Sequence, residues 1–155
     1  LVRRTTFKNI DPSQQLVFEV LDGPASFQPF GVDDWHLKHM GRTMEAWYRI
    51  LNMKESKNTL PFAKLSASLA DTAISSAIVR GNWALAFIED DNNLDEAGNH
   101  ELVPFVVDPA LVFGSDTALS YPLALDESSV ADLAISDQMT SSKTPCIFAA
   151  TKFKL

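Results

Sequence analysis

The chain has 155 residues, of which 46% are hydrophobic, and its 13 basic and 20 acidic residues give a formal net charge of −7. This length supports one domain with its own core and is short for two. The acidic balance disfavours a surface built broadly for nucleic acid or anionic membrane, although it leaves room for one local basic patch. No run approaches the roughly 18 apolar residues of a membrane span, and the amino end lacks a signal-peptide pattern, so we expect a soluble protein.

The amino-terminal segment, residues 1–9, holds the basic cluster of the sequence, in Arg3, Arg4 and Lys8. A short arm of this kind can contact phosphate by charge alone, with salt-sensitive affinity. The alternative is an ordinary solvated terminus. The chain begins at Leu1 instead of methionine, which is compatible with a longer arm in the full gene product.

A strand and a helix are predicted in the first third of the chain. Residues 14–22 (QQLVFEVLD) have the β-branched and aromatic content of a strand, and the proline- and glycine-rich residues 23–31 predict a loop. Asp33 and Asp34 suit a helix amino terminus, and the apolar spacing from Trp35 onward predicts an amphipathic helix of about 15 residues. The end of this helix is left open, because WYRILNM could already be a strand.

Beyond residue 80 the sequence changes to short apolar runs separated by polar, glycine and proline residues, which is typical of an all-β region. The runs predicted as strands are WALAFIE, ELVPFVV, ALVFG, ALSYPLAL and CIFAATKFKL. Pro104 and Pro122 mark edges, bulges or strand ends within them. Residues 128–139 could be a short helix capped by Ser128 or Ser129, or a loop, while residues 59–79 contain apolar residues at both helix and strand spacing.

Cys146 is the single cysteine, so no intrachain disulfide and no thiolate metal cluster can form. Its strand-like flanks predict a buried small hydrophobe, not a nucleophile.

The acidic segment after residue 88 does not match a calcium-binding EF-hand loop. An EF-hand loop needs oxygen ligands at fixed positions and a glycine at its sixth. A loop starting at Asp90 has Leu94 at a ligand position, and one starting at Asp91 has Glu96 at the glycine position, so both fail. A looser cation site using Asp90, Asp91 or Asp95 is the remaining metal hypothesis, against a solvated turn.

His36 and His39 lie three residues apart on the predicted helix, and HEXXH is absent. A zinc site generally needs a third ligand, for which the sequence offers only the distant His100. Acid–base chemistry by either histidine with Asp33 or Asp34 is chemically reasonable, because histidine titrates near neutrality. The sequence has no GXSXG, GXGXXG or GXXXXGK[ST] motif, and we expect no cofactor.

Taken in order, the segments LVFEVL, WYRILNM, SSAIVRGNWALAFIEDD and IFAATKFKL resemble the single jelly-roll coat proteins of small RNA viruses. In such proteins an aromatic–Arg strand often follows a helix, and a later small–Gly–x–aromatic–x–apolar–Ala–Phe strand ends in acidic residues. The corresponding residues here are 47–53 and 81–91.

This resemblance implies a mainly β protein with one amphipathic helix, folded as an antiparallel jelly-roll sandwich of eight strands. It implies self-assembly into a shell that encloses nucleic acid, with Arg3, Arg4 and Lys8 directed at RNA. The acidic turn at residues 89–96 would lie where subunits meet. The expected location is the virion or the host cytoplasm, with no membrane partner.

Two alternatives stay open. One is a small α+β enzyme, an isomerase, dehydratase or cyclase with a helix across a cone-shaped sheet, in which His36 or His39 works with Asp34 in an apolar pocket. The other is a binding module without chemistry, in which Trp35, Trp47 and Trp83 are exposed anchors.

Overall fold

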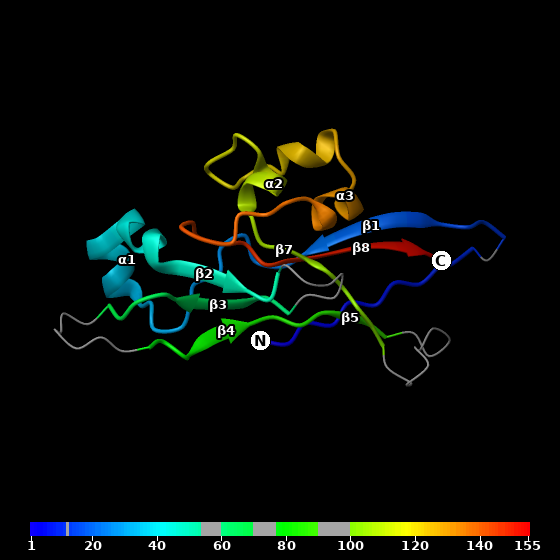
Figure 1. Cartoon of the computed structure of the whole chain (residues 1–155). Helices are drawn as coiled ribbons and strands as arrows, with labels where there is room; N and C mark the ends of the chain where they lie inside the picture. Colours follow the sequence, from blue (N-terminus) through cyan, green and yellow to red (C-terminus); the bar gives the residue numbers. More distant parts are fainter. Residues whose placement is uncertain (12, 54–59, 70–76, 90–99) are drawn as a thin grey trace.

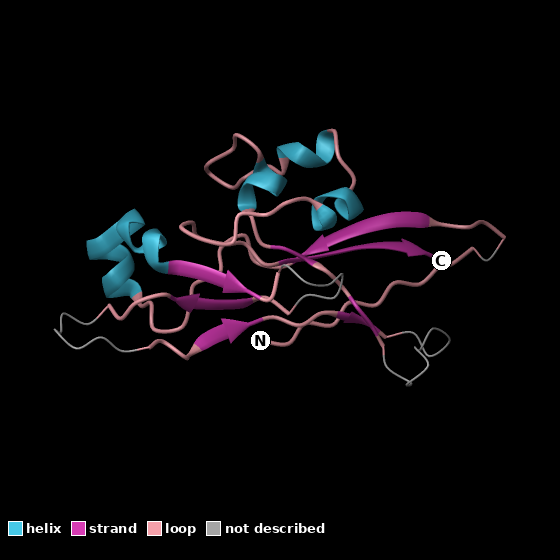
Figure 2. Ribbon diagram, in the orientation of Figure 1, coloured by secondary structure: helices cyan, strands magenta, loops and turns pink. Residues whose placement is uncertain are grey.

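The computed structural model describes residues 1–11, 13–53, 60–69, 77–89 and 100–155. Figures 1 and 2 show short strands through the middle of an elongated molecule, with helices on one side and at one end. Within the described residues, eight short antiparallel strands form three small sheets. The protein is therefore a mixed α/β structure dominated by short antiparallel strands.

The first sheet joins the two ends of the sequence. β1 (Val17–Asp22) pairs along its whole length with β8 (Phe148–Lys154), which also pairs with β7 (Phe105–Val106). The strands predicted at residues 14–22 and at the carboxyl end are confirmed. In β8, Lys152 and Lys154 are exposed, as is usual for alternate residues of a half-buried strand.

The other two sheets are built from the middle of the chain. β2 (Tyr48–Leu51), β3 (Phe62–Leu65) and β4 (Gly81–Trp83) lie in that order in one sheet. β5 (Phe87–Ile88) and β6 (Glu101–Leu102) form a two-stranded sheet. The sequence predicts one strand for WALAFIE and one for ELVPFVV. In the structure the first segment contributes to β4 and β5, and the second to β6 and β7, and in each case the two strands belong to different sheets.

Helices cover one face of the first sheet. α2 (Pro109–Phe113) and α3 (Val130–Ile135) lie above β1, β8 and β7 (Figure 1). Their apolar side chains pack on this sheet in one cluster, which comprises Val106, Val112, Phe113, Val130, Leu133, Cys146, Phe148 and Ala150. Ser129 caps α3 by accepting a hydrogen bond from the Asp132 amide, so the predicted serine cap is confirmed.

Two predicted strands prove to be helical or turn structure. ALVFG lies in α2 because Asp108 caps its first turn and Pro109 occupies the first position, where proline costs no hydrogen bond. ALSYPLAL contains a turn and the 3₁₀ helix η2 (Leu123–Asp126). Asp116 organises this turn by accepting hydrogen bonds from three following amides, which lower the pKa of its carboxyl group.

The predicted 15-residue helix is shorter and is broken. α1 (Asp34–Met40) ends at Gly41, whose φ of 52° is a conformation that glycine adopts readily. A 3₁₀ helix, η1 (Gly41–Trp47), continues to β2, so the chain is already a strand from Tyr48. α1 buries none of its residues and lies at one end of the molecule (Figure 1).

The fold agrees with the sequence-based expectation in its short antiparallel strands and differs from it in the arrangement of the sheets and in the number of helices. Among the described residues, two four-stranded sheets packed face to face are not present, so the jelly-roll sandwich is not seen there. The expectation of a single helix is wrong, because α2 and α3 were predicted as a strand and as an undecided segment. α2 and α3 bury apolar side chains on the first sheet, whereas the histidine-bearing α1 has no buried residue and contributes the partly buried Met40 to the cluster of Met44, Tyr48 and Leu65.

Candidate functional site

The strongest candidate site is the extended segment at residues 81–88, which changes partner midway. Its first half pairs with β3, and the Ala84 amide extends that pairing by donating to the Pro61 carbonyl, 3.2 Å away. Its second half pairs with β6, and the Ala86 carbonyl accepts from the Val103 amide at 2.9 Å. One stretch of chain thus forms the edge of two small sheets.

Among the described residues, the backbone of this segment has hydrogen-bond partners on one side only. In an extended chain, alternate residues direct their N–H and C=O groups to the same side. Ala84 and Ala86 face β3 and β6, so the groups of Trp83, Leu85 and Phe87 face the opposite edge. No backbone hydrogen bond joins that edge to another described segment. We call it the open edge.

The side chains of the segment alternate in the same way. Ala84 and Ala86 pack against the core, whereas Trp83, Leu85 and Phe87 are 65, 45 and 51% exposed. The strand therefore has two faces, and the face with the three large side chains is the one that meets solvent.

Neighbouring strands extend this exposed surface. Leu51, Phe62 and Trp83 lie side by side across β2, β3 and β4, and Phe87 lies opposite Leu102. We call the surface the apolar face and define it by Leu51, Phe62, Trp83, Leu85, Phe87 and Leu102. Gly81 is required within it, because a Cβ there would lie 2.5 Å from the Ala63 carbonyl oxygen and 2.6 Å from the Phe62 ring. Monomeric soluble proteins rarely expose a continuous apolar surface without using it.

The opposite edge of the same sheet, at β2, is covered. The Ile50 amide donates to the Thr140 carbonyl at 2.7 Å, and the Ser142 amide donates to the Tyr48 carbonyl at 3.1 Å. Residues 140–142 therefore act as an additional strand-like cover along β2.

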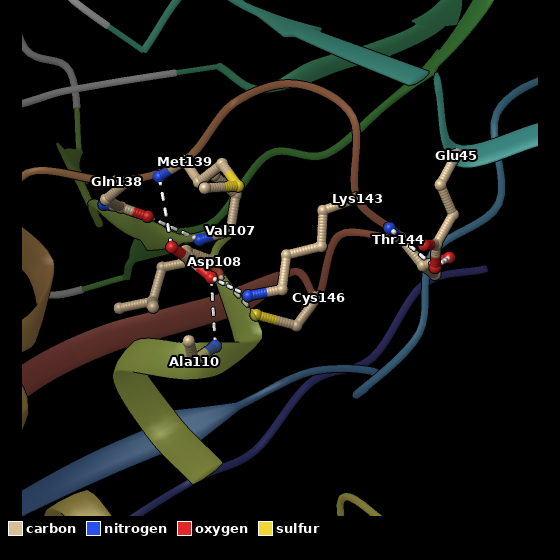
Figure 3. Close-up of polar contacts among 10 residues, drawn as sticks. Glu45, Val107, Asp108, Ala110, Gln138, Met139, Lys143, Thr144 and Cys146 are labelled. Carbon is tan, nitrogen blue, oxygen red and sulfur yellow. Dashed lines mark hydrogen bonds and ion pairs between the residues drawn. The ribbon is translucent and has the colours of Figure 1, made fainter. Parts of the chain in front are cut away.

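Asp108 holds this cover in place (Figure 3). Its carboxylate is nearly buried and accepts hydrogen bonds from the Ala110 amide at 2.9 Å, the Met139 amide at 3.2 Å and the Lys143 ammonium at 2.9 Å. Gln138 adds two bonds, accepting from the Val107 amide and donating to the Phe105 carbonyl. Sequence reasoning missed this network, although the Asp–Pro pair at the start of α2 was a readable capping signal.

A second anchor lies at the other end of the cover. The Thr144 hydroxyl donates to the Glu45 carboxylate at 2.8 Å, as Figure 3 also shows. Cys146 follows, and its thiol donates to the Val106 carbonyl at 3.4 Å. The cysteine is fully buried, as predicted, and desolvation raises the pKa of its thiol to about 12.

His36 lies beside an open groove of about 480 Å³. The described residues that line the groove are Phe30, Gly31, His36, Leu65, Ser68, Leu69, Ala77, Ile78, Val79 and Arg80. His36 Nδ1 is 2.6 Å from Asp33 Oδ1, so the carboxylate that contacts the ring belongs to Asp33, not to Asp34. The same oxygen accepts the His36 amide as the helix cap, and these bonds lower the pKa of Asp33.

His39 lies away from the groove. Its exposed ring packs against the Trp35 ring at a centroid distance of 4.8 Å, and Trp35 itself is 60% exposed. Trp35 also contacts the His36 ring edge-on, at a centroid distance of 5.4 Å. Of the three tryptophans predicted as exposed anchors, Trp35 and Trp83 are exposed and Trp47 is half-buried.

The basic residues of the amino-terminal segment contact carboxylates of the same chain. Arg3 pairs with Asp22 at 2.9 Å and Arg4 pairs with Glu89 at 2.6 Å. Phe7 anchors the segment between Phe18 and Phe153, with ring centroids 5.0 and 5.2 Å away. Lys8 is exposed.

The cation candidates Asp90, Asp91 and Asp95 lie outside the described residues. Within the described ranges, no group of three or more histidine, cysteine, aspartate or glutamate side chains is placed to hold a metal ion. In the same ranges, no helix has both the length and the apolar character needed to cross a bilayer.

Compared with known proteins, the chain matches no protein-family model, and neither a curated protein nor a solved structure is significantly similar to it.

Proposed function

We propose that this protein is a structural subunit that assembles with further copies of itself. The observation that carries the proposal is the apolar face, where Trp83, Leu85 and Phe87 are each about half or more exposed on a segment with an open edge. Burial of such side chains against a partner stabilises an assembly by about 25 cal/mol for each Å² of apolar surface removed from water.

The finer form of this proposal is a coat protein whose shell encloses nucleic acid, as the resemblance to jelly-roll coat proteins implies. It is supported by the antiparallel strands and by the pairing of β1 with β8, because Greek-key sandwiches require pairing between strands far apart in sequence. Nucleic acid would have to displace Asp22 and Glu89 from Arg3 and Arg4, so we expect weak, salt-sensitive binding at these residues.

Trp83→Lys tests the proposal. We expect self-association to weaken about 30-fold, because an exposed tryptophan in the centre of an interface typically contributes about 2 kcal/mol. The free energy of unfolding should change by less than about 0.5 kcal/mol, since the side chain is mostly exposed. Sedimentation velocity over a range of concentrations measures the first quantity, and urea denaturation measures the second.

Trp35→Lys is the matched control, because Trp35 is similarly exposed but lies on α1, away from the apolar face. It should leave association unchanged, as should His36→Gln. A wild-type protein that stays monomeric at the highest attainable concentration contradicts the proposal. The absorbance ratio at 260 and 280 nm of any assembled material then tests the finer form, since a shell around nucleic acid must carry it along.

A further inference from the structure

We infer that two copies pair edge to edge through residues 81–88, as antiparallel strands related by a two-fold axis. This inference rests on the proposed self-assembly and specifies its partner, its edge and its register. The occupant of the open edge is a second copy of the same segment.

The backbone supplies the first argument. An uncovered edge presents a row of unpaired N–H and C=O groups, which is a template for another strand. Here the row belongs to Trp83, Leu85 and Phe87, the residues whose side chains are also exposed. A two-fold axis makes such a contact self-complementary, because each copy offers the same groups that it needs.

The alternation of the strand limits the possible registers. Residues that exchange hydrogen bonds across an antiparallel pair must both direct their backbone groups at the partner, so odd-numbered residues must lie opposite odd-numbered residues. Placing Leu85 opposite Leu85 satisfies this condition and overlaps the full segment. It also places Trp83 opposite Phe87, and aromatic pairs of this kind stabilise sheets.

Charge selects the antiparallel direction. Arg80 precedes the segment and Glu89 follows it, and both side chains are exposed. Antiparallel pairing brings the Arg80 end of each copy to the Glu89 end of the other, whereas parallel pairing places like charges together. Arg80 also lies over the Phe30 ring at 5.7 Å, and Glu89 also pairs with Arg4, so both charges are oriented by groups of their own chain.

Single cysteines test the register. In the two-fold arrangement, Leu85→Cys places two thiols on directly opposed residues, whose Cα atoms are about 5.5 Å apart in a hydrogen-bonded antiparallel pair. This separation suits a disulfide. In Trp83→Cys the two thiols are offset by four residues, or about 13 Å, and cannot reach each other. Because this change also weakens association, its mixture with Phe87→Cys, which places the two thiols on opposed residues, is the control. The buried native Cys146 does not compete, and Ile135→Cys on α3 reports random collision.

We expect Leu85→Cys to form a disulfide-linked dimer under mild oxidation, with Trp83→Cys and Ile135→Cys linking about tenfold more slowly or not at all. A mixture of Trp83→Cys and Phe87→Cys should form the mixed dimer, identified by its mass. Equal linking at all three single positions, or faster linking at Trp83, overturns the register.

Sedimentation of the same reduced variants separates this inference from the proposed function. Association without any Leu85 disulfide overturns edge pairing and leaves self-assembly standing. Absence of association in the wild-type protein overturns both.

Discussion

The two edges of the sheet β2–β3–β4 differ in what the chain does with them. Residues 140–142 lie along β2, and a network centred on Asp108 fixes them there. The edge at β4 has no such cover among the described residues, although the same segment carries Trp83, Leu85 and Phe87 on its surface. Proteins commonly protect sheet edges against unwanted pairing. The difference between a covered edge and a more apolar open edge supports the proposed contact between copies at the open edge.

Asp108→Ala should have the largest effect, because it loosens the cover along β2 and so removes the difference between the two edges. The change removes the cap of α2 and the bond to the Met139 amide, and it leaves the half-buried Lys143 without its carboxylate. We expect the free energy of unfolding to fall by about 3 kcal/mol, measured by urea denaturation. Because the cover of β2 is loosened, the variant should also form irregular aggregates larger than the wild-type assemblies.

Lys143→Met separates the ion pair of Asp108 from the hydrogen bonds that Asp108 accepts from backbone amides. It keeps the aliphatic stem and removes the charge, while the amides of Ala110 and Met139 remain as donors to Asp108. The loss of stability should be about 1 kcal/mol, because the carboxylate keeps its backbone hydrogen bonds. If Asp108→Ala has no larger effect than Lys143→Met, the carboxylate does not hold the cover.

The buried thiol of Cys146 should make the free energy of unfolding depend on pH in the alkaline range. Burial raises the pKa of its thiol from 9.0 to about 12, so the thiol ionises more readily in the unfolded chain. Its contribution to stability is therefore complete below pH 9 and is lost as the pH rises from about 9 toward about 12. The free energy of unfolding should fall by up to about 1.4 kcal/mol per pH unit in this window.

Cys146→Ala is the comparison that isolates this effect from other alkaline titrations, including those of Tyr48 and Tyr121, whose pKa values are also raised. The variant is expected to be less stable at neutral pH and to show a shallower loss above pH 9. Identical slopes for the two proteins would show that the thiol is accessible to solvent in the folded state.

The sequence predicted the elements whose signals are local. The strand at residues 14–22 and the cap of α3 each depend on neighbouring residues, and each is present. The break at Gly41 was also a local signal, but the continuing apolar spacing through Met44 and Trp47 outweighed it in the prediction.

The sequence could not predict features that depend on distant partners. Whether the face of Trp83 meets another layer or solvent depends on the sheet order, which no pattern within residues 81–88 encodes. Asp108 is joined to Met139 and Lys143 across more than 30 positions, so its role as the anchor of the β2 cover could not be read from its neighbours. The Asp–Pro pair predicts a cap there, and no more.

A charge exchange at the open edge should have the smallest effect on association. It tests whether the two copies pair in the antiparallel direction. Arg80→Glu and Glu89→Arg each place like charges at the junction of two antiparallel copies. Each should weaken association about twofold to fivefold, since an exposed ion pair contributes about 0.2–1 kcal/mol. The double variant restores opposite charges and should recover most of the wild-type affinity, measured by sedimentation at low salt.

Each single variant also removes a contact within its own chain, namely Arg80 over Phe30 or Glu89 with Arg4. Those losses would persist in the double variant, so recovery of association can come only from a contact between the two ends of the segment. Raising the salt concentration should diminish the differences among the four proteins, because screening acts on exposed charges. If the double variant is weaker than either single variant, the two ends do not meet, and the copies are not antiparallel at this edge.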